Sequence, residues 1–467
     1  MNGRQVAELK FSEVLKGNIY FRIEAEYFAK KYLETEKLLR DVGSVYIKTF
    51  ADVTDGEHGS PDLDESSGIV YLSGQNILDN TLDLDDIRFC SKTLHQRNSR
   101  SALVKNNILM SIVGTVGSAS VIYKDILGNT DRNVATIKNI TSKFSPYFVS
   151  TFLNCKYGKN QTERFSTGNV QPLLNLLQVK SILIPEIDFF LQTQVENLVK
   201  QAHRKLDESK AVYAEANNLL LNELGLREWS PSNKNTAVKS LRESFLDSGR
   251  LDAEYYQLKY DEMKNVVKAN AVSVCHVKSI ETFNQRGEQP RYIADGKLRV
   301  INSRHILEQH LDYENLERTN ADEWETFPLA RVFRNDVLIY TTGANVGRTN
   351  VYMSDEPALA SNHVNILRIE NANPVYVGFV LNSYVGRMQT RQIVTGSAQA
   401  ELYSNAISQF IMPFISDNSQ RTITDYVEKS YLLKVESRRL LEVAKRAVEI
   451  AIEENEQAAF KFIKTVN

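Results

Sequence analysis

The chain has 467 residues, of which 42% are hydrophobic and 24% are charged, an ordinary composition for a globular protein of about two to four domains. Its formal net charge of −2 excludes the overall basic bias of a protein that coats nucleic acid, although a specific DNA binder needs only a local basic face. Cys90, Cys155 and Cys275 lie far apart, which argues against a structural zinc site and fits a reducing compartment. With no apolar run of roughly 18 residues and no signal-peptide core, a cytoplasmic protein without membrane contact is expected.

The chain repeats itself about 228 residues apart. Residues 22–28 (RIEAEYF) return as residues 250–256 (RLDAEYY), and Pro185 returns as Pro413. Two copies of one fold in one chain usually make two similar sites related by a pseudo-two-fold axis. Duplex DNA is the common two-fold-symmetric polymer that matches such an arrangement.

The first half begins with short β-branched or aromatic runs bounded by turn residues. These runs predict strands at residues 44–47, 68–72, 108–112 and 119–123. Residues 146–155 predict a short helix with a proline in its first turn. A mixed α/β domain is therefore expected.

Each α/β region is followed by a long segment without proline or glycine, at residues 189–224 and 419–464. At 1.5 Å per residue these segments predict helices of about 54 Å and about 69 Å. Apolar or small residues recur with heptad spacing in the first and less regularly in the second, so the two helices are expected to pair antiparallel as a coiled coil. The residues of this helix seam include Val195, Val199, Leu206, Tyr213, Leu220, Ile423, Val427, Leu441 and Val448.

The predicted fold class is α+β, with two pseudo-repeated α/β domains separated by the two long helices. The predicted boundaries are an N-terminal segment of the repeat unit (1–20), a first α/β domain (21–187), a central helix (188–226), a linker (227–248), a second α/β domain (249–415) and a distal helix (416–467).

No convincing catalytic or metal-binding pattern occurs in the sequence. The glycine turns at residues 114–117 and 343–347 are too short for a phosphate-binding loop, and no lysine follows them. The histidines lack the spacing of metal ligands, and no metalloprotease or serine-hydrolase motif is present. We therefore expect a chain that is not an enzyme and that holds no metal.

Basic and amide-rich loops inside the two α/β regions are the remaining candidates for a binding site. Arg and Lys suit guanine edges and phosphates, whereas Asn and Gln suit adenine edges. Because the halves differ most in these loops while the apolar framework repeats, one scaffold would read two different half-sites. The candidate DNA-binding residues are His58, Lys92, His95, Arg97, Arg100, Lys159, Gln161 and Arg164 in the first half, and Arg286, Arg291, Arg304, His305, Arg348, Arg387 and Arg391 in the second.

Four motifs of the first half resemble, in their order, those of the specificity subunits of type I restriction–modification systems. They are residues 54–61 (TDGEHGSP), 72–77 (LSGQNI), 114–117 (GTVG) and 167–173 (TGNVQPL). The second half departs more, with GEQPRY at 287–292 and VINSRHI at 300–306, but it keeps Thr395, Gly396 and Ser397.

This resemblance implies a non-catalytic DNA reader in which each target recognition domain reads one half of a split, asymmetric site. It further implies that the helices fix the spacer and dock two modification subunits, which methylate adenine with S-adenosylmethionine. Restriction subunits that use ATP would join the assembly. S-adenosylmethionine, ATP and Mg²⁺ are therefore expected only on partner subunits.

Three other interpretations remain open at this point. A duplicated protein–protein scaffold would show no dependence of DNA binding on Arg97, Arg100 or Arg348. A recognition module working with a nuclease–methylase fusion would be close to the favoured interpretation. An enzyme with an unrecognised site is disfavoured by the missing catalytic pattern.

Overall fold

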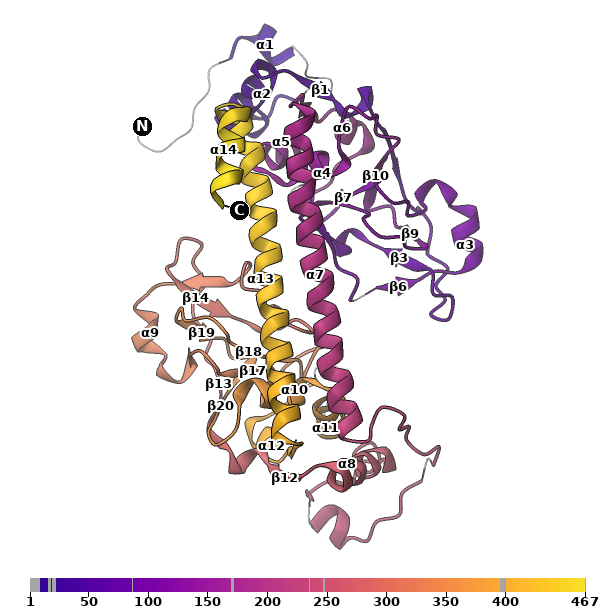
Figure 1. Cartoon of the computed structure of the whole chain (residues 1–467), viewed down its shortest axis with the longest axis vertical. Helices are drawn as coiled ribbons and strands as arrows, with labels where there is room; N and C mark the ends of the chain where they lie inside the picture. The colour runs from indigo at the N-terminus through magenta and orange to yellow at the C-terminus, as the bar shows by residue number, and fades with distance from the viewer. Residues whose placement is uncertain are drawn as a thin grey trace. The chain divides into compact units, whose positions relative to one another are not determined.

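The computed structural model describes residues 9–466, except residues 16, 17, 19–21, 86, 169–171, 235, 247 and 395–399. The chain forms two compact units (Figure 1). Unit 1 comprises Met1–Leu206 and Val435–Asn467, and unit 2 comprises Asp207–Lys434. Each unit contains one α/β domain and part of both long helices, which confirms the predicted α+β fold class. None of the helices in the described part of the chain is long and apolar enough to cross a membrane.

Unit 1 is built around a four-stranded antiparallel sheet with the strand order β2-β10-β7-β8. A second sheet has the order β6-β3-β9, and β1 pairs with β11, so that the start and the end of the domain lie together. The strands are β1 (Ser44–Tyr46), β2 (Asp52–Asp55), β3 (Val70–Leu72), β4 (Ile77–Leu78), β5 (Thr81–Leu82), β6 (Arg88–Phe89), β7 (Ile108–Ser111), β8 (Ala119–Val121), β9 (Gly128–Thr130), β10 (Val134–Lys138) and β11 (Leu183–Pro185).

Unit 1 also contains short helices, several of which pack on its sheets (Figure 1). They are α1 (Phe11–Leu15), α2 (Lys30–Asp41), α3 (Lys92–Arg97), α4 (Pro146–Asn154), α5 (Lys156–Phe165) and α6 (Leu176–Lys180). The predicted helix at residues 146–155 is thus α4, and it begins with Pro146 in the first turn. Ser145 caps it by accepting the N–H of Phe148, and the helix packs on β8 with Phe148 and Phe152 fully buried.

Unit 2 repeats this architecture, because its main sheet has the corresponding order β13-β20-β17-β18 and β12 pairs with β21. Its second sheet has four strands, β15-β14-β19-β16, instead of three. The elements are α8 (Leu258–Asn270), β12 (Ser273–His276), β13 (Glu281–Arg286), β14 (Leu298–Ile301), β15 (Glu317–Thr319), α9 (Glu323–Thr326), β16 (Arg331–Val332), β17 (Val337–Tyr340), β18 (Thr349–Val351), β19 (Ala358–Ala360), β20 (Val364–Ile369), α10 (Pro374–Asn382), α11 (Tyr384–Ile393), α12 (Ser404–Ser408) and β21 (Ile411–Phe414).

The two long helices are α7 (Phe189–Glu223) and α13 (Asp417–Glu453), and they pair antiparallel within each unit. In unit 1, Ser437 donates its hydroxyl to the carbonyl of Ala202 at 2.7 Å. In unit 2, the Ser209 and Ser430 hydroxyls lie 3.0 Å apart, and Ser419 donates to Glu223 at 2.9 Å. Residue numbers thus fall along α13 as they rise along α7, which confirms the predicted antiparallel pairing.

The predicted helix seam is buried at most of its positions. Val195, Val199, Leu220, Ile423, Leu441 and Val448 are buried, whereas Leu206, Tyr213 and Val427 are half-buried. Several of these residues also join the core of the adjoining α/β domain. The predicted boundaries between α/β domains and helices stay a prediction, because the two units divide the chain within α7 and within α13.

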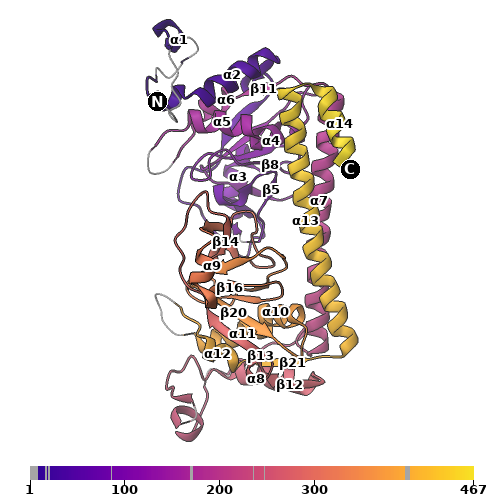
Figure 2. The same cartoon turned by 90° about the vertical axis from the view of Figure 1, so that its left-hand side faces the viewer.

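The distal segment departs from the uninterrupted helix predicted at residues 419–464. It forms α13, which ends at Glu453, and a separate helix α14 (Glu456–Val466). The side chain of Asn455 caps the start of α14, because its oxygen accepts the N–H of Ala458 at 2.9 Å. Asparagine is preferred at this capping position. Figure 2 shows α14 folded back beside α13, where Arg439 donates to the carbonyl of Val466 at 2.9 Å.

Candidate nucleic-acid interface

The edge strand of each main sheet leads into a short segment, here called the strand-end turn, that exposes polar side chains. In unit 1 it comprises the last residue of β2 and the four residues that follow, 55–59. The N–H of Glu57 donates to the carbonyl of Thr130 at 3.0 Å, and a Cβ placed on Gly56 would lie 2.0 Å from that oxygen. Only glycine allows this approach, so the sequence GEH presents its charged residues at a fixed place.

Three of the predicted cations of unit 1 meet at the strand-end turn. His58 lies 2.8 Å from a carboxylate oxygen of Asp55, and Arg100 donates to the carbonyl of Gly56 at 3.3 Å. Arg97 lies 3.3 Å from Glu57. The side chains of His58, Arg97 and Arg100 are 53–60% exposed, so each keeps solvent-facing polar atoms while a carboxylate contacts it. A hydrogen bond from the Gly59 N–H lowers the pKa of Glu57, and the charge of Arg97 adds to this effect.

The segment that carries Arg97 is a helix, α3, whereas the sequence predicted a loop there. The Nδ1 of His95 lies 2.5 Å from the side-chain oxygen of Asn129, so this face of the ring is held against the protein, and a contact between His95 and DNA stays a prediction. The buried Asn129 also donates to the carbonyl of Asn98 at 2.8 Å, so it anchors the end of α3 on the sheet. Lys92 is exposed on the first turn of the same helix.

Lys159, Gln161 and Arg164 lie on helix α5, so their predicted placement in a loop is wrong. Lys159 is 2.8 Å from Asp79. Gln161 is buried and brackets Leu183, donating to its carbonyl at 3.0 Å and accepting its N–H at 2.8 Å. These contacts hold the side chains against the protein, and their role in DNA binding stays a prediction.

Unit 2 has the same strand-end turn but presents a different cation. Gly287 follows β13, and a Cβ there would lie 2.1 Å from the carbonyl of Ala360. Arg286 donates to the carbonyl of Leu402 at 2.9 Å and lies 3.5 Å from Glu401. Its guanidinium carbon is 4.8 Å from the ring centroid of Tyr403, a residue 52% exposed.

Two other candidate cations of unit 2 share one carboxylate. Arg348 and Arg387 lie 3.0 Å and 3.1 Å from Glu308. Burial lowers the pKa of Arg387, against the opposing charge of Glu308. Arg387 lies on α11, where the sequence predicted a loop, and it is the repeat counterpart of Lys159 on α5.

The remaining candidates of unit 2 are scattered. Arg304 pairs with Glu317, and burial lowers the pKa of His305, whose Nδ1 accepts the N–H of Asn302. Arg291 and Arg391 are exposed. Asn169, Val170 and Gln171 of the first closing segment, and Thr395, Gly396 and Ser397 of the second, lie outside the described residues.

Sequence reasoning missed the carboxylates and the tyrosine that hold these cations, namely Asp55, Glu57, Glu401 and Tyr403. The only signal for the first two was their place in the TDGEHGSP motif. Nothing in the sequence marked Tyr403, because its contact with Arg286 joins positions more than a hundred residues apart.

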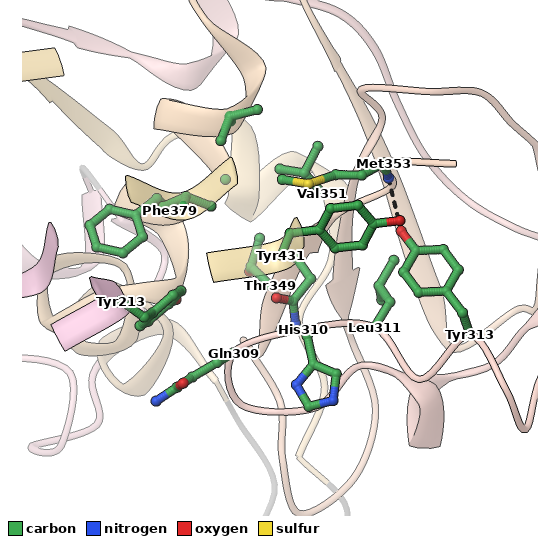
Figure 3. A pocket seen from close by; sticks show the side chains of 14 residues that line it. Tyr213, Gln309, His310, Leu311, Tyr313, Thr349, Val351, Met353, Phe379 and Tyr431 are labelled. Atoms are coloured by element: carbon green, nitrogen blue, oxygen red, sulfur yellow. Dashed lines mark hydrogen bonds between the residues drawn. The ribbon is translucent and has the colours of Figure 1, made fainter. Parts of the chain in front are cut away.

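A narrow cavity lies in unit 2 where α7 and α13 meet the domain (Figure 3). Its lining includes Tyr213, His310, Phe379 and Tyr431, and its volume is about 40 Å³. The Met353 N–H donates to the Tyr313 hydroxyl at 2.8 Å across one side. A space of this size holds about one or two water molecules, so it is a packing defect and not a nucleotide site.

Comparisons with known proteins place these features beside one group of proteins. No family model matches the chain. The specificity subunit of the type I restriction enzyme EcoBI from Escherichia coli is 28% identical over 160 residues, which are 34% of this chain and 33% of that protein. The aligned part thus spans about a third of the curated relative. This alignment confirms the resemblance to type I specificity subunits that the motifs indicated.

Solved structures with similar chains include two specificity subunits. The S subunit of a type I restriction–modification system from M. genitalium gives a TM-score of 0.38 at 11% identity, covering 91% of this chain and 95% of that chain. The HsdS subunit from Thermoanaerobacter tengcongensis gives a TM-score of 0.27 at 14% identity, with 91% and 95% covered.

Proposed function

We propose that this chain is the DNA-recognition subunit of a type I restriction–modification complex and is not itself an enzyme. Each unit would read one half of a split, asymmetric DNA site. The observation that carries this proposal is the duplicated strand-end turn, which keeps its glycine in both units but presents His58, Arg97 and Arg100 in one and Arg286 in the other. One frame with two sets of donors is what two different half-sites require.

The ion pairs at these turns suit reversible contact with DNA. Exposed pairs such as Arg97 with Glu57 contribute at most about 1 kcal/mol to stability, so exchanging the carboxylate for a phosphate or a base edge costs little. Because the chain has a net charge of −2, its own affinity for DNA should be weak and should fall steeply with salt.

The long helices would fix the spacer between the half-sites and would dock two modification subunits, with restriction subunits joining the same assembly. S-adenosylmethionine, ATP and Mg²⁺ would then bind to those partners. The antiparallel pairing of α7 and α13 within each unit supports this role, because a paired helix is a stiff element of defined length.

Single-molecule methylation sequencing of the host genome, with and without the gene, tests the proposal. We expect loss of adenine methylation at one split, asymmetric motif, restored by the intact gene. A gene in which Arg97 and Arg100 are both replaced by Ala should restore it poorly. An unchanged methylome in cells that express the chain without a co-purifying modification subunit would contradict the proposal and favour a protein–protein scaffold.

A further inference from the structure

The last residue of the edge strand occupies the same place in both units but carries opposite charge. In unit 1, Asp55 of β2 pairs with Ala135 of β10, which pairs with Met110 of β7. In unit 2, Arg286 of β13 pairs with Asn365 of β20, which pairs with Ile339 of β17. The two rows match strand for strand, so Asp55 and Arg286 are structural counterparts.

The backbone around this position is preserved while the side chain changes. Gly56 and Gly287 follow directly, and each lies against a carbonyl oxygen that a Cβ would meet at 2.0 Å or 2.1 Å. Glu57 and Glu288 come next, and each donates its N–H to that same carbonyl, at 3.0 Å and 3.1 Å. The frame is therefore constant, and the chemistry that the turn offers to a ligand depends on the residue before the glycine.

We propose that this strand-end position, Asp55 in unit 1 and Arg286 in unit 2, is a specificity-determining position of each recognition domain. The inference rests on the proposed function and adds to it the residues that set which base each domain accepts. It assigns a direct role to Arg286 and a positioning role to Asp55.

Arg286 has the geometry of a base reader. The Tyr403 ring, the carbonyl of Leu402 and the Glu401 carboxylate all contact its guanidinium. Its side chain is 25% exposed, and both terminal nitrogens contact protein oxygens. Once DNA displaces Glu401, the planar guanidinium would offer parallel N–H donors that match the O6 and N7 acceptors of guanine. Unit 2 should therefore select guanine at one position of its half-site.

Asp55 acts through its neighbours. Its side chain is only 15% exposed, and its two oxygens lie 2.8 Å from His58 and 3.7 Å from Arg100, both of which are more than half exposed. Removing the charge of Asp55 would weaken the contacts that hold the His58 ring and the Arg100 guanidinium in place. The half-site of unit 1 should then become less selective, although Asp55 itself need not touch DNA.

The test replaces each residue in the full chain, co-expressed with its modification subunit, and reads the methylated motif of the host genome. Arg286→Gln should relax one base position in one half of the motif, by about tenfold or more in the ratio of preferred to other bases. Arg286→Lys keeps the charge but loses the planar fork, so it should relax the same position. Asp55→Asn should relax only the other half.

Matched controls come from the same two units. Arg299→Gln removes an ion-paired arginine of similar exposure in unit 2, 23% against 25%, and Asp52→Asn changes the first residue of β2. Both controls should leave the motif unchanged. If the Arg286 and Asp55 variants keep the full motif and only lower the methylated fraction at every site, their role is structural and the inference is wrong. Absence of any motif that depends on the wild-type chain would instead overturn the proposed function.

Discussion

Arg164 donates to the carboxylate of Glu36 at 2.6 Å, and 228 residues further along the chain the same two positions hold Gln392 and Lys264. There the direction is reversed, because Lys264 donates to the side-chain oxygen of Gln392 at 2.6 Å. Arg164 also donates to the carbonyl of Tyr27 at 2.9 Å, and Gln392 donates to the carbonyl of Tyr255 at 3.1 Å. The contacts of Arg164 therefore join α5 to α2 and to the segment before it, and those of Gln392 join α11 to α8 and to the segment before it. Both residues of the pair differ between the two units, so the contact is present in both, as an ion pair in unit 1 and as a hydrogen bond from a lysine to an amide in unit 2.

We predict that Arg164→Gln destabilises unit 1 by about 2 kcal/mol, because the side chain is only 10% exposed and its loss leaves Glu36 with Arg40 as its remaining cation and the carbonyl of Tyr27 without its donor. The double variant Glu36→Lys with Arg164→Gln copies the pair of unit 2 and should regain most of this loss. Thermal unfolding of the two variants and of Glu36→Lys alone measures the coupling. Equal destabilisation in the double variant and in Arg164→Gln would show that the pair is not transferable.

The same pair should make stability depend on pH in the acid range. Burial raises the pKa of Glu36, but hydrogen bonds from Arg164 and Arg40 outweigh it, so the net pKa lies below the ordinary value of 4.5. A carboxyl with a lowered folded-state pKa stabilises the fold above its unfolded pKa, and that stability is lost as pH falls through the folded value. The difference in free energy of unfolding between the wild type and Glu36→Gln should therefore shrink between about pH 5 and about pH 3. A difference that stays constant over this range would contradict the assignment.

The long helices could be predicted because the spacing of their apolar residues is a local pattern. The repeat could be predicted because its two copies can be compared within the chain. The central helix was predicted at residues 189–224 and is observed at Phe189–Glu223. The break at Asn455 was missed because neither proline nor glycine marks it. The Asn455 cap ends one helix and starts the next only because α14 can then pack against α13, a contact that the local sequence does not show.

The candidate site was predicted less well, because an arginine that binds a distant carboxylate looks the same in sequence as one that faces solvent. Arg164 is an example, since its partner Glu36 is 128 residues away. Comparison of the repeats held the missing signal, because Glu36 and Arg164 change jointly to Lys264 and Gln392. Arg97 and Arg100 are exposed, although Arg97 lies at the end of α3 and not in the predicted loop, and their contact with DNA stays a prediction.

Gly56→Ala should impair one half of recognition more than overall folding. The new Cβ would lie 2.0 Å from the carbonyl of Thr130, a backbone atom that cannot move without shifting β9. We expect a cost of about 2 kcal/mol or more and loss of the half-site read by unit 1. Gly59→Ala in the same turn is the matched control, because the nearest atom, 3.1 Å away, belongs to the flexible Glu57 side chain. Methylation sequencing and thermal unfolding measure the two effects, and equal losses in both variants would contradict the prediction.

Charge removal at the turn of unit 1 should lower the salt dependence of DNA binding. Arg97→Ala and Arg100→Ala each remove one exposed cation, so the slope of log affinity against log salt should fall by up to about one for each phosphate that is no longer bound. Fluorescence anisotropy of the assembled methyltransferase on its own site measures the slope. Lys105→Ala, which removes a half-exposed cation paired with Asp125 elsewhere in unit 1, should leave it unchanged.

Lengthening both long helices together should lengthen the spacer of the recognised site. Seven residues inserted after Leu206 in α7 add about 10.5 Å, or roughly three base pairs of DNA. An equal insertion after Leu432 in α13 keeps the register, because Ser209 and Ser430 show which stretches of the two helices face each other. Each insertion adds one whole heptad, so the helix seam should re-form and both half-sites should keep their sequences while the gap between them grows. An insertion in α7 alone leaves the helices mismatched and should abolish methylation. If the double insertion supports methylation at the original spacing, the helices do not set the spacer.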